Sequence, residues 1–297
     1  MASMTKAQPR PPASRAGRIV AALQRGPLHL IIIAIALIWM LPTVGLLVSS
    51  FRPPHLVSTT GWWTAFKLPF TFTLENYYRV LTTNNMGTSF VNSLFVSIPA
   101  TVIPIMIAAF AAYAFAWMPF KGRDVLFLVV VGLQVVPLQM TLIPILRLFT
   151  DLKLTGTFRA IWLAHSGYGL PLAIYLLRNF FGSLPREMLE ASYIDGASPV
   201  TTFFRLVLPT SVPALASLAI FQFLWVWNDL LIALIYLGGQ RSVAPMTVTV
   251  ANLVNSYGQD WQLLTAAAFI SMLLPMVVFF SLQQYFVRGI LAGSVKG

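Results

Sequence analysis

Long apolar runs, each about as long as a bilayer is thick, constrain this chain more than any other feature of its sequence. A helix needs roughly 20 mostly apolar residues to cross the hydrocarbon core of a membrane. The chain therefore predicts an all-α polytopic membrane protein with about six transmembrane helices. The expected spans are 28–48, 90–117, 125–146, 161–181, 212–237 and 263–286.

The composition supports a membrane location. Of the 297 residues, 58% are hydrophobic and only 9% are charged. A soluble domain carries about 25% charged residues, so this chain lacks the polar groups to cover itself in water. We expect the remaining apolar surface to face the lipid bilayer.

Several functional classes are disfavoured by what the sequence lacks. The chain has no cysteine and three scattered histidines (His29, His55 and His165), so we expect no metal site and no cofactor. No Gly-Lys-Ser/Thr phosphate loop, HExxH or GxSxG motif occurs. The chain is therefore not expected to be an enzyme or to hydrolyse ATP by itself.

The distribution of positive charge predicts the orientation. The net charge of +11 lies in loops and tails, so it indicates membrane topology and no nucleic-acid partner. The first tail contains five basic residues and no acid, and an even number of spans then places both termini in the cytoplasm. We expect a disordered basic tail at 1–27, a transmembrane domain at 28–286 and a cytoplasmic C-terminal tail at 287–297. The five basic residues are Lys6, Arg10, Arg15, Arg18 and Arg25.

The loop 182–211, between the fourth and fifth expected spans, has strong helix start and stop signals. Pro185 suits the first turn of a helix, and Gly196 suits the position just after its end. Glu187 and Glu190 fall in the first turns, where the helix dipole favours acids. The loop thus predicts a short helix over 185–195, and Ser198 followed by Pro199 predicts a second helix start.

The spacing in this loop resembles the EAA loop of ABC importer permeases. That pattern is Glu-Ala-Ala, three residues, Gly, nine residues and Ile-x-Leu-Pro. Ser192 replaces the second Ala and Leu206 replaces Ile. The alternative is an ordinary amphipathic helix at the membrane surface. The matching positions are Glu190, Ala191, Ser192, Gly196, Leu206, Leu208 and Pro209.

Two further stretches are similar to the maltose-type carbohydrate-uptake permeases: 222–231, which reads QFLWVWNDLL, and the ending 285–297. The resemblance runs from about residue 28 to the end. It implies the type I ABC importer permease fold and import of an oligosaccharide such as an α-glucoside across a bacterial inner membrane. The implied partners are a second permease subunit in a heterodimer, two ATP-binding subunits and an extracytoplasmic sugar-binding protein.

In that family, the short helix sits in a cleft of the ATP-binding subunit and transmits its closure to the membrane helices. The resemblance therefore implies an ATPase-coupling element in this loop. Small residues suit such a contact because they let two backbones approach closely. Its members are Glu190, Ala191, Ser192, Asp195, Gly196 and Ala197.

Polar residues inside the expected spans are candidates for a substrate path, because such residues are expensive in a membrane. Sugar hydroxyls bind amides and carboxylates, and a sugar ring packs on an aromatic face. The alternative, which we favour for Asp229, is an interhelical bridge to Arg147 or His165. The candidate path residues are Gln134, Gln222, Trp227, Asn228 and Asp229.

Two interpretations stay open. An ion-gradient-driven secondary transporter would show internal repeats and intramembrane acids, and only Asp229 is an acid clearly inside an expected span. The aromatic residues of the loop 51–89 are either interfacial anchors or a docking surface for an external partner.

Overall fold

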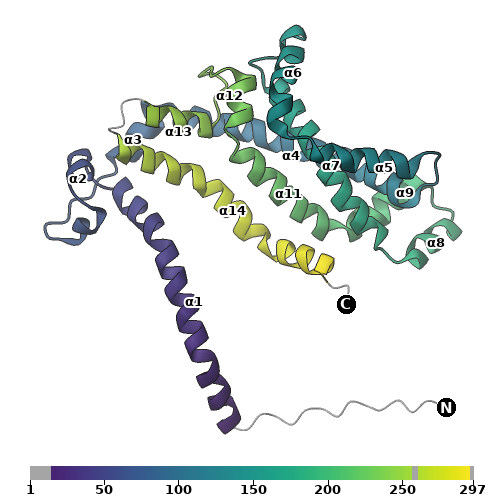
Figure 1. Cartoon of the computed structure of the whole chain (residues 1–297), viewed down its shortest axis with the longest axis horizontal. Helices are drawn as coiled ribbons and strands as arrows, with labels where there is room; N and C mark the ends of the chain where they lie inside the picture. Colours follow the sequence, from purple (N-terminus) through teal and green to yellow (C-terminus); the bar gives the residue numbers. More distant parts are fainter. Residues whose placement is uncertain (1–14, 256–259, 295–297) are drawn as a thin grey trace.

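Every regular element in the described part of the chain is a helix, and Figure 1 shows their arrangement. The computed structural model describes the backbone of residues 15–255 and 260–294 and the side chains of 26–253 and 260–283. The first half contains α1 (Arg15–Ser50), α2 (Pro54–Thr59), η1 (Trp62–Phe66), α3 (Glu75–Thr82), α4 (Met86–Trp117), α5 (Arg123–Gly132), η2 (Leu133–Val135) and α6 (Leu138–Asp151). The second half contains α7 (Phe158–Gly182), α8 (Arg186–Ile194), α9 (Pro199–Thr202), η3 (Phe203–Val207), α10 (Leu208–Thr210), α11 (Val212–Trp227), α12 (Leu231–Leu237), α13 (Met246–Asn255) and α14 (Trp261–Ser294).

Four helices are long and apolar enough to cross a membrane alone: Gly26–Ser50 of α1, all of α4, all of α7 and Trp261–Gln283 of α14. Two bent pairs, Arg123–Val135 with Leu138–Asp151 and Pro199–Thr210 with Val212–Trp227, also meet the criteria when each counts as one span. The prediction of about six membrane helices is confirmed in this sense.

The expected third span, 125–146, is sharply bent. It breaks between η2 and α6 with a bend of 100°. Val136 is extended (φ −70°, ψ 117°), the conformation favoured before a proline. Pro137, which follows, cannot donate a helical hydrogen bond, so the chain changes direction there.

The expected fifth span, 212–237, is also interrupted. Helix α11 ends at Trp227, and a new helix, α12, begins at Leu231. The Asn228 side chain donates to the Leu224 carbonyl oxygen at 2.7 Å, and the Asp229 carboxylate accepts the Ala233 N–H at 3.1 Å. Side chains that bond to nearby backbone in this way compete with helix continuation.

The outermost helices extend beyond the domain boundaries expected from the sequence. Helix α1 is already helical from Arg15, ahead of residue 28, and α14 continues to Ser294, past residue 286. Residues 1–14 of the expected first tail and 295–297 of the second lie outside the described residues.

The centre of the fold is the α4–α7 pair, which packs together more extensively than any other pair of elements in the described part. Helix α4 presents the fully buried small residues Ala100, Ala108 and Ala112, which permit close helix approach. Helix α1 runs away from the other helices and meets them near its C-terminal end (Figure 1). Its exposed apolar side chains are therefore available to lipid or to a partner.

Side-chain and backbone bonds define two ends of the bundle. At one end, the Trp117 indole N–H donates to the Phe181 carbonyl at 2.9 Å, which joins the C-termini of α4 and α7. At the other end, the Gly156 N–H donates to the Tyr236 carbonyl at 2.7 Å. The loop 182–211 and the α4–α5 link thus share one end, and the α6–α7 and α12–α13 links share the other.

Candidate functional site

The short helix predicted in the loop 182–211 is present as α8, with Pro185 at its N-cap and Asp195 at its C-cap. Gly196 has a φ of +79°. Its N–H donates to Tyr193 O and the Ala197 N–H donates to Ser192 O, both at 3.0 Å. This bond pair is the Schellman motif, in which a left-handed glycine ends a helix. The predicted helix and its glycine stop are confirmed.

The second predicted helix start is also confirmed. The Ser198 side chain accepts the Thr201 N–H at 3.2 Å, and Pro199 occupies the first position of α9. Helix α9 continues into η3, a π-helical turn that begins at Phe203. Single π turns within α-helices are frequent at functional sites.

The coupling residues expected from the resemblance form an accessible surface. Ser192 and Ala197 are partly covered, and the other four, Glu190, Ala191, Asp195 and Gly196, are exposed. No atom lies within 4 Å of the position that a β-carbon at Gly196 would occupy. Two large apolar side chains beside it, Ile194 and Val200, are 85% and 64% exposed. This combination of small residues and uncovered apolar groups suits a contact with another protein.

Ser192 is the one predicted coupling residue on the inward face of α8, and Leu189 and Tyr193 on the same face were not predicted as site residues. Leu189 is 1% exposed and packs in the core cluster with Phe181, Phe203 and Val207. The Ser192 hydroxyl bonds the Thr202 hydroxyl at 2.9 Å, and the Tyr193 hydroxyl lies 3.2 Å from the Tyr113 hydroxyl. Positions 189, 192 and 193 share one face of a helix, and this spacing was the signal in the sequence.

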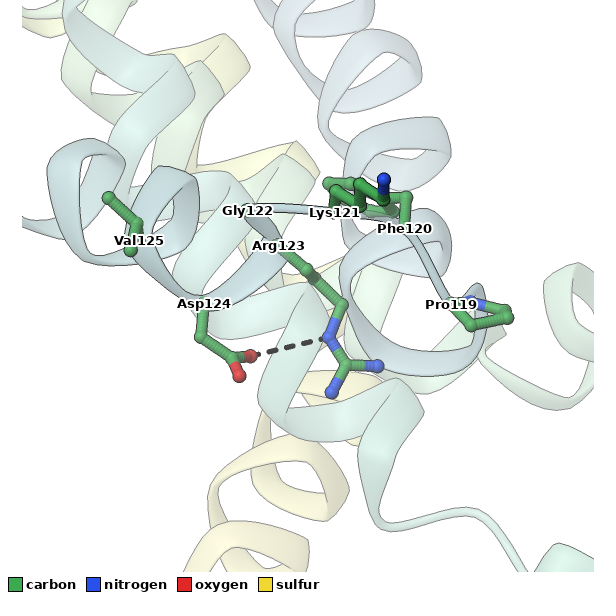
Figure 2. A pocket seen from close by; sticks show the side chains of 7 residues that line it. All are labelled: Pro119, Phe120, Lys121, Gly122, Arg123, Asp124 and Val125. Atoms are coloured by element: carbon green, nitrogen blue, oxygen red, sulfur yellow. Dashed lines mark hydrogen bonds and ion pairs between the residues drawn. The ribbon is translucent and has the colours of Figure 1, made fainter.

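A hollow beside the α4–α5 link lies at the same end of the bundle and is lined by Pro119 to Val125 (Figure 2). Arg123 and Asp124 form an ion pair of 3.3 Å within it, and the Asp124 side chain is 85% exposed. An ion pair exposed to solvent contributes little to stability. The hollow contains none of the predicted site residues.

The candidate path residue Gln222 connects three helices. Its amide donates to Ala100 O on α4 at 3.2 Å and to His165 O on α7 at 3.5 Å. It packs so closely on Gly169 that a β-carbon there would lie 2.7 Å from the Gln222 Oε1. Buried polar groups with backbone partners hold membrane helices together.

Trp227 is 2% exposed, and its indole N–H donates to Ser271 O on α14 at 3.0 Å. Its ring also packs on Phe90 and Phe223. By contrast, Asn228 and Gln134 have exposed side chains. The structure therefore places Trp227 and Gln222 among helix contacts, while Asn228 and Gln134 lie at the two helix breaks.

Asp229 lies beside His165, one of the two bridging partners considered for it. The Asp229 Oδ2 is 3.7 Å from the His165 Nε2, and the two side chains are 11% and 0% exposed. The Asp229 backbone carbonyl accepts the Thr247 hydroxyl at 2.7 Å. Asp229 thus joins the start of α12 to α7 and to α13.

The loop 51–85 on the other end of the bundle is folded around a buried arginine. Arg52 is 1% exposed and donates to Leu56 O and to the Thr64 hydroxyl, and burial lowers the pKa of its guanidinium. Trp63 and Phe66 on η1 are 64% and 60% exposed. These uncovered rings are compatible with either anchoring or docking.

Bent and straight apolar helices around a buried α4–α7 pair, with a glycine-stopped surface helix at one end, define a polytopic membrane protein. Residues 88–292 match the family described as "Binding-protein-dependent transport system inner membrane component", and the chain belongs to this family. This confirms the resemblance on which the sequence interpretation rested, and it sets aside the secondary transporter.

Relatives of known name are also permeases. The chain is 60% identical over 276 residues to the osmoprotective compounds uptake permease protein GgtD of Synechocystis sp., covering 92% of this chain and 93% of that one. It is 58% identical over 231 residues to the alpha-glucoside transport system permease protein AglG of Rhizobium meliloti, covering 76% and 61%. Since its relatives are permease subunits, the prediction that the chain is not an enzyme is confirmed.

A solved structure supports the fold. A bacterial ABC transporter involved in the import of the acidic polysaccharide alginate has a chain that matches this one with a TM-score of 0.65 and 15% identity, covering 91% of this chain and 99% of that one. This likeness confirms the predicted ABC importer permease fold.

Proposed function

We propose that this chain is the membrane-spanning permease subunit of an ATP-driven, binding-protein-dependent importer of an oligosaccharide such as an α-glucoside. The 58% identity to the alpha-glucoside permease of Rhizobium meliloti supports this substrate class. The trehalose/maltose permease of Thermococcus litoralis, 32% identical over 271 residues, supports it further. Labelled maltose or trehalose that is taken up by the assembled importer, and not by one lacking this chain, tests the proposal.

A second candidate is uptake of osmoprotective compounds, because the 60% identical permease of Synechocystis sp. carries that name. The two candidates separate in a binding assay on the extracytoplasmic binding protein. Binding of an α-glucoside favours the first, and binding only of an osmoprotectant outside the α-glucosides favours the second.

The proposed complex contains a second permease subunit, two ATP-binding subunits and a sugar-binding protein outside the membrane. This chain forms half of the translocation path, in the bacterial inner membrane with both termini in the cytoplasm. The orientation rests on the basic, acid-free residues 1–27. The end of the bundle with the loop 182–211 then faces the cytoplasm, where the ATP-binding subunits lie.

The coupling surface is proposed at Glu190, Ala191, Ser192, Asp195, Gly196 and Ala197. One observation carries the assignment: α8 is stopped by a left-handed, fully accessible glycine at the spacing of the EAA loop. The ATP-binding subunit would contact this surface and move α8 when it closes.

For the substrate path, Gln134 and Asn228 remain the better candidates, because their polar side chains are exposed at helix breaks. The bonds made by Gln222, Trp227 and Asp229 support a packing role for these three.

Gly196→Asp tests the coupling surface, and we expect it to abolish ATP-driven uptake while the chain stays in the membrane. A residue with a β-carbon in the left-handed region costs about 1–2 kcal/mol. The added carboxylate would also be buried without a partner against the ATP-binding subunit. Uptake of labelled sugar, the amount of chain in the membrane and co-purification of the ATP-binding subunit are measured together.

Gly182→Asp is the matched control. Gly182 ends α7, has no atom within 4 Å of its β-carbon position and lacks a positive φ. We expect this variant to keep most of its uptake. Normal uptake by Gly196→Asp at a normal membrane level would show that this loop is not the coupling element.

A further inference from the structure

The described contacts of α8 with the membrane bundle run through its inward face. Leu189 anchors the helix in the core, and the Ser192–Thr202 hydroxyl bond ties it to α9. The Tyr193 hydroxyl reaches beyond these neighbours to the Tyr113 hydroxyl on α4, 80 positions earlier in the chain, at 3.2 Å. This last contact joins the surface helix directly to the central helix of the fold.

The two tyrosines differ in their surroundings. Tyr113 is 3% exposed, whereas Tyr193 is 43% exposed. One side of the contact is therefore fixed in the core, and the other is accessible next to the proposed coupling surface. A movement of α8 would change the Tyr193 position first and reach Tyr113 through the hydroxyl pair.

The π turn that follows converges on the same part of α4. The Phe203 ring centroid lies 5.3 Å from that of Tyr113 and 4.8 Å from that of Phe110. The Leu208 N–H donates to the Phe203 carbonyl, which closes the π turn. Ring pairs at these separations attract beyond their burial, so Phe203 holds the chain after α8 against α4.

Helix α4 is suited to carry a displacement across the membrane. It runs from Met86 to Trp117 as one helix and packs against α7, α11 and α13. Near its other end, the Asn92 amide donates to Ser242 O at 3.0 Å and to Ala244 O at 3.1 Å, which holds the α12–α13 link. Through Tyr113 at one end and Asn92 at the other, α4 therefore contacts elements at both ends of the bundle.

We infer that Tyr193, Tyr113 and Phe203 are the positioning residues through which movement of α8 reaches α4 and, along it, the opposite end of the permease. This inference rests on the proposed coupling role of α8 and adds the route inside this chain. It requires the hydroxyl pair to act as a unit, which a double-mutant cycle can test.

The experiment uses the complete importer reconstituted in proteoliposomes with its binding protein and maltose or trehalose as the probe. The number of sugars transported per ATP hydrolysed is measured for Tyr113→Phe, Tyr193→Phe and the double variant. Each single change removes one hydroxyl and keeps the ring, so ATP hydrolysis should continue. We expect each single variant to lower the ratio by a factor of about 2–10, the equivalent of one hydrogen bond.

The double variant should be no worse than either single variant, because the same contact is lost in all three. Tyr175→Phe, which removes a hydroxyl on α7 outside this contact, should leave the ratio unchanged. Phe203→Leu keeps an apolar side chain but removes the ring contacts. In a chain with both tyrosines intact, it should also lower the number of sugars transported per ATP hydrolysed. If a tyrosine variant does not assemble, Phe203→Leu still tests the proposed route from α8 to α4.

An unchanged ratio in the assembled tyrosine variants and in Phe203→Leu would overturn the inference, and so would independent, multiplying effects of the two tyrosine changes. The coupling surface is judged separately. If Gly196→Asp abolishes uptake while these variants transport normally, the surface stands and only this route is wrong.

Discussion

Two adjacent polar side chains, Asn228 and Asp229, end one helix and start the next. Asn228 bonds back to the Leu224 carbonyl, and Asp229 accepts the Ala233 N–H at the start of α12. The Asp229 carboxylate also lies 3.7 Å from His165. Asp229 therefore bonds the first turn of α12 and also contacts α7. Two different substitutions of Asp229 can distinguish these two roles.

Asp229→Ala removes both roles, and we expect it to reduce folded yield and assembly more than sugar affinity. The loss of a cap alone costs about 1 kcal/mol, which lowers the midpoint of thermal unfolding by about 2 °C for a chain of this size. Thermal unfolding in detergent and co-purification of the partner subunits measure the effect.

Asp229→Asn is the control, because an amide oxygen still caps α12 but carries no charge toward His165. It should recover part of the stability lost in Asp229→Ala. Normal assembly of the alanine variant with an altered range of transported sugars would instead assign Asp229 to the substrate path.

The tertiary roles of buried polar residues were only partly predictable. Asp229 could be proposed as a bridge because an intramembrane acid needs a partner, and His165 was one of two candidates. The packing of the Gln222 side chain against Gly169 could not be predicted from the sequence, because it depends on how closely α11 approaches α7. That distance is set by packing across residues far apart in the chain.

Among the elements, α4 combines the central packing with control of the α12–α13 link. Besides the two Asn92 bonds, the Ser93 hydroxyl accepts the Met246 N–H at 2.8 Å and the Ser89 hydroxyl lies 2.6 Å from that of Thr249. The first three turns of α4 thus hold the start of α13 through polar contacts.

Asn92→Leu should loosen α13 without unfolding the permease. The change leaves the carbonyls of Ser242 and Ala244 without their donor, at about 1–3 kcal/mol for a buried group. We expect faster amide hydrogen exchange over residues 246–253 and little change in α7. Val91→Leu, at a neighbouring position that is 48% exposed, is the control. Equal exchange in both variants would contradict the assigned role of Asn92.

The existence of the long helices was predictable, whereas their interruptions were not. Apolar length alone identified α4, α7 and the apolar part of α14, since lipid requires a fully hydrogen-bonded backbone. Pro137 lies at the break of the third span, but apolar content does not report direction, so the 100° turn could not be predicted from it. In the loop 182–211, local signals at Gly196 and Ser198 determined the structure, and the predicted helix, its glycine stop and the second helix start were correct.

Across the whole molecule, the links between helices fall into two groups at opposite ends of the bundle. The hydrogen bonds of Trp117 and Gly156 define these groups. Because the chain contains no cysteine, single cysteines can report the side of the membrane on which each group lies.

We expect Lys121→Cys and Ser198→Cys to react with an impermeant thiol reagent only from the cytoplasmic side. Trp63→Cys and Arg241→Cys should react only from the outside. All four side chains are exposed in this chain, so the labelling is done on the permease without its ATP-binding subunits. Labelling of positions 121 and 63 from the same side would refute the proposed topology.

The unequal burial of the membrane helices also bears on how the protein is made. Helix α1 is the most apolar of the four long spans and has almost no buried surface in its membrane window, so it can rest in lipid without the remaining helices. Helix α7 is the least apolar, and half of its window is buried, mainly against α4. During synthesis α4 leaves the ribosome before α7, and it offers a surface on which a weakly apolar helix can be retained. We therefore expect the stable insertion of α7 to depend on α4, which is already in the membrane.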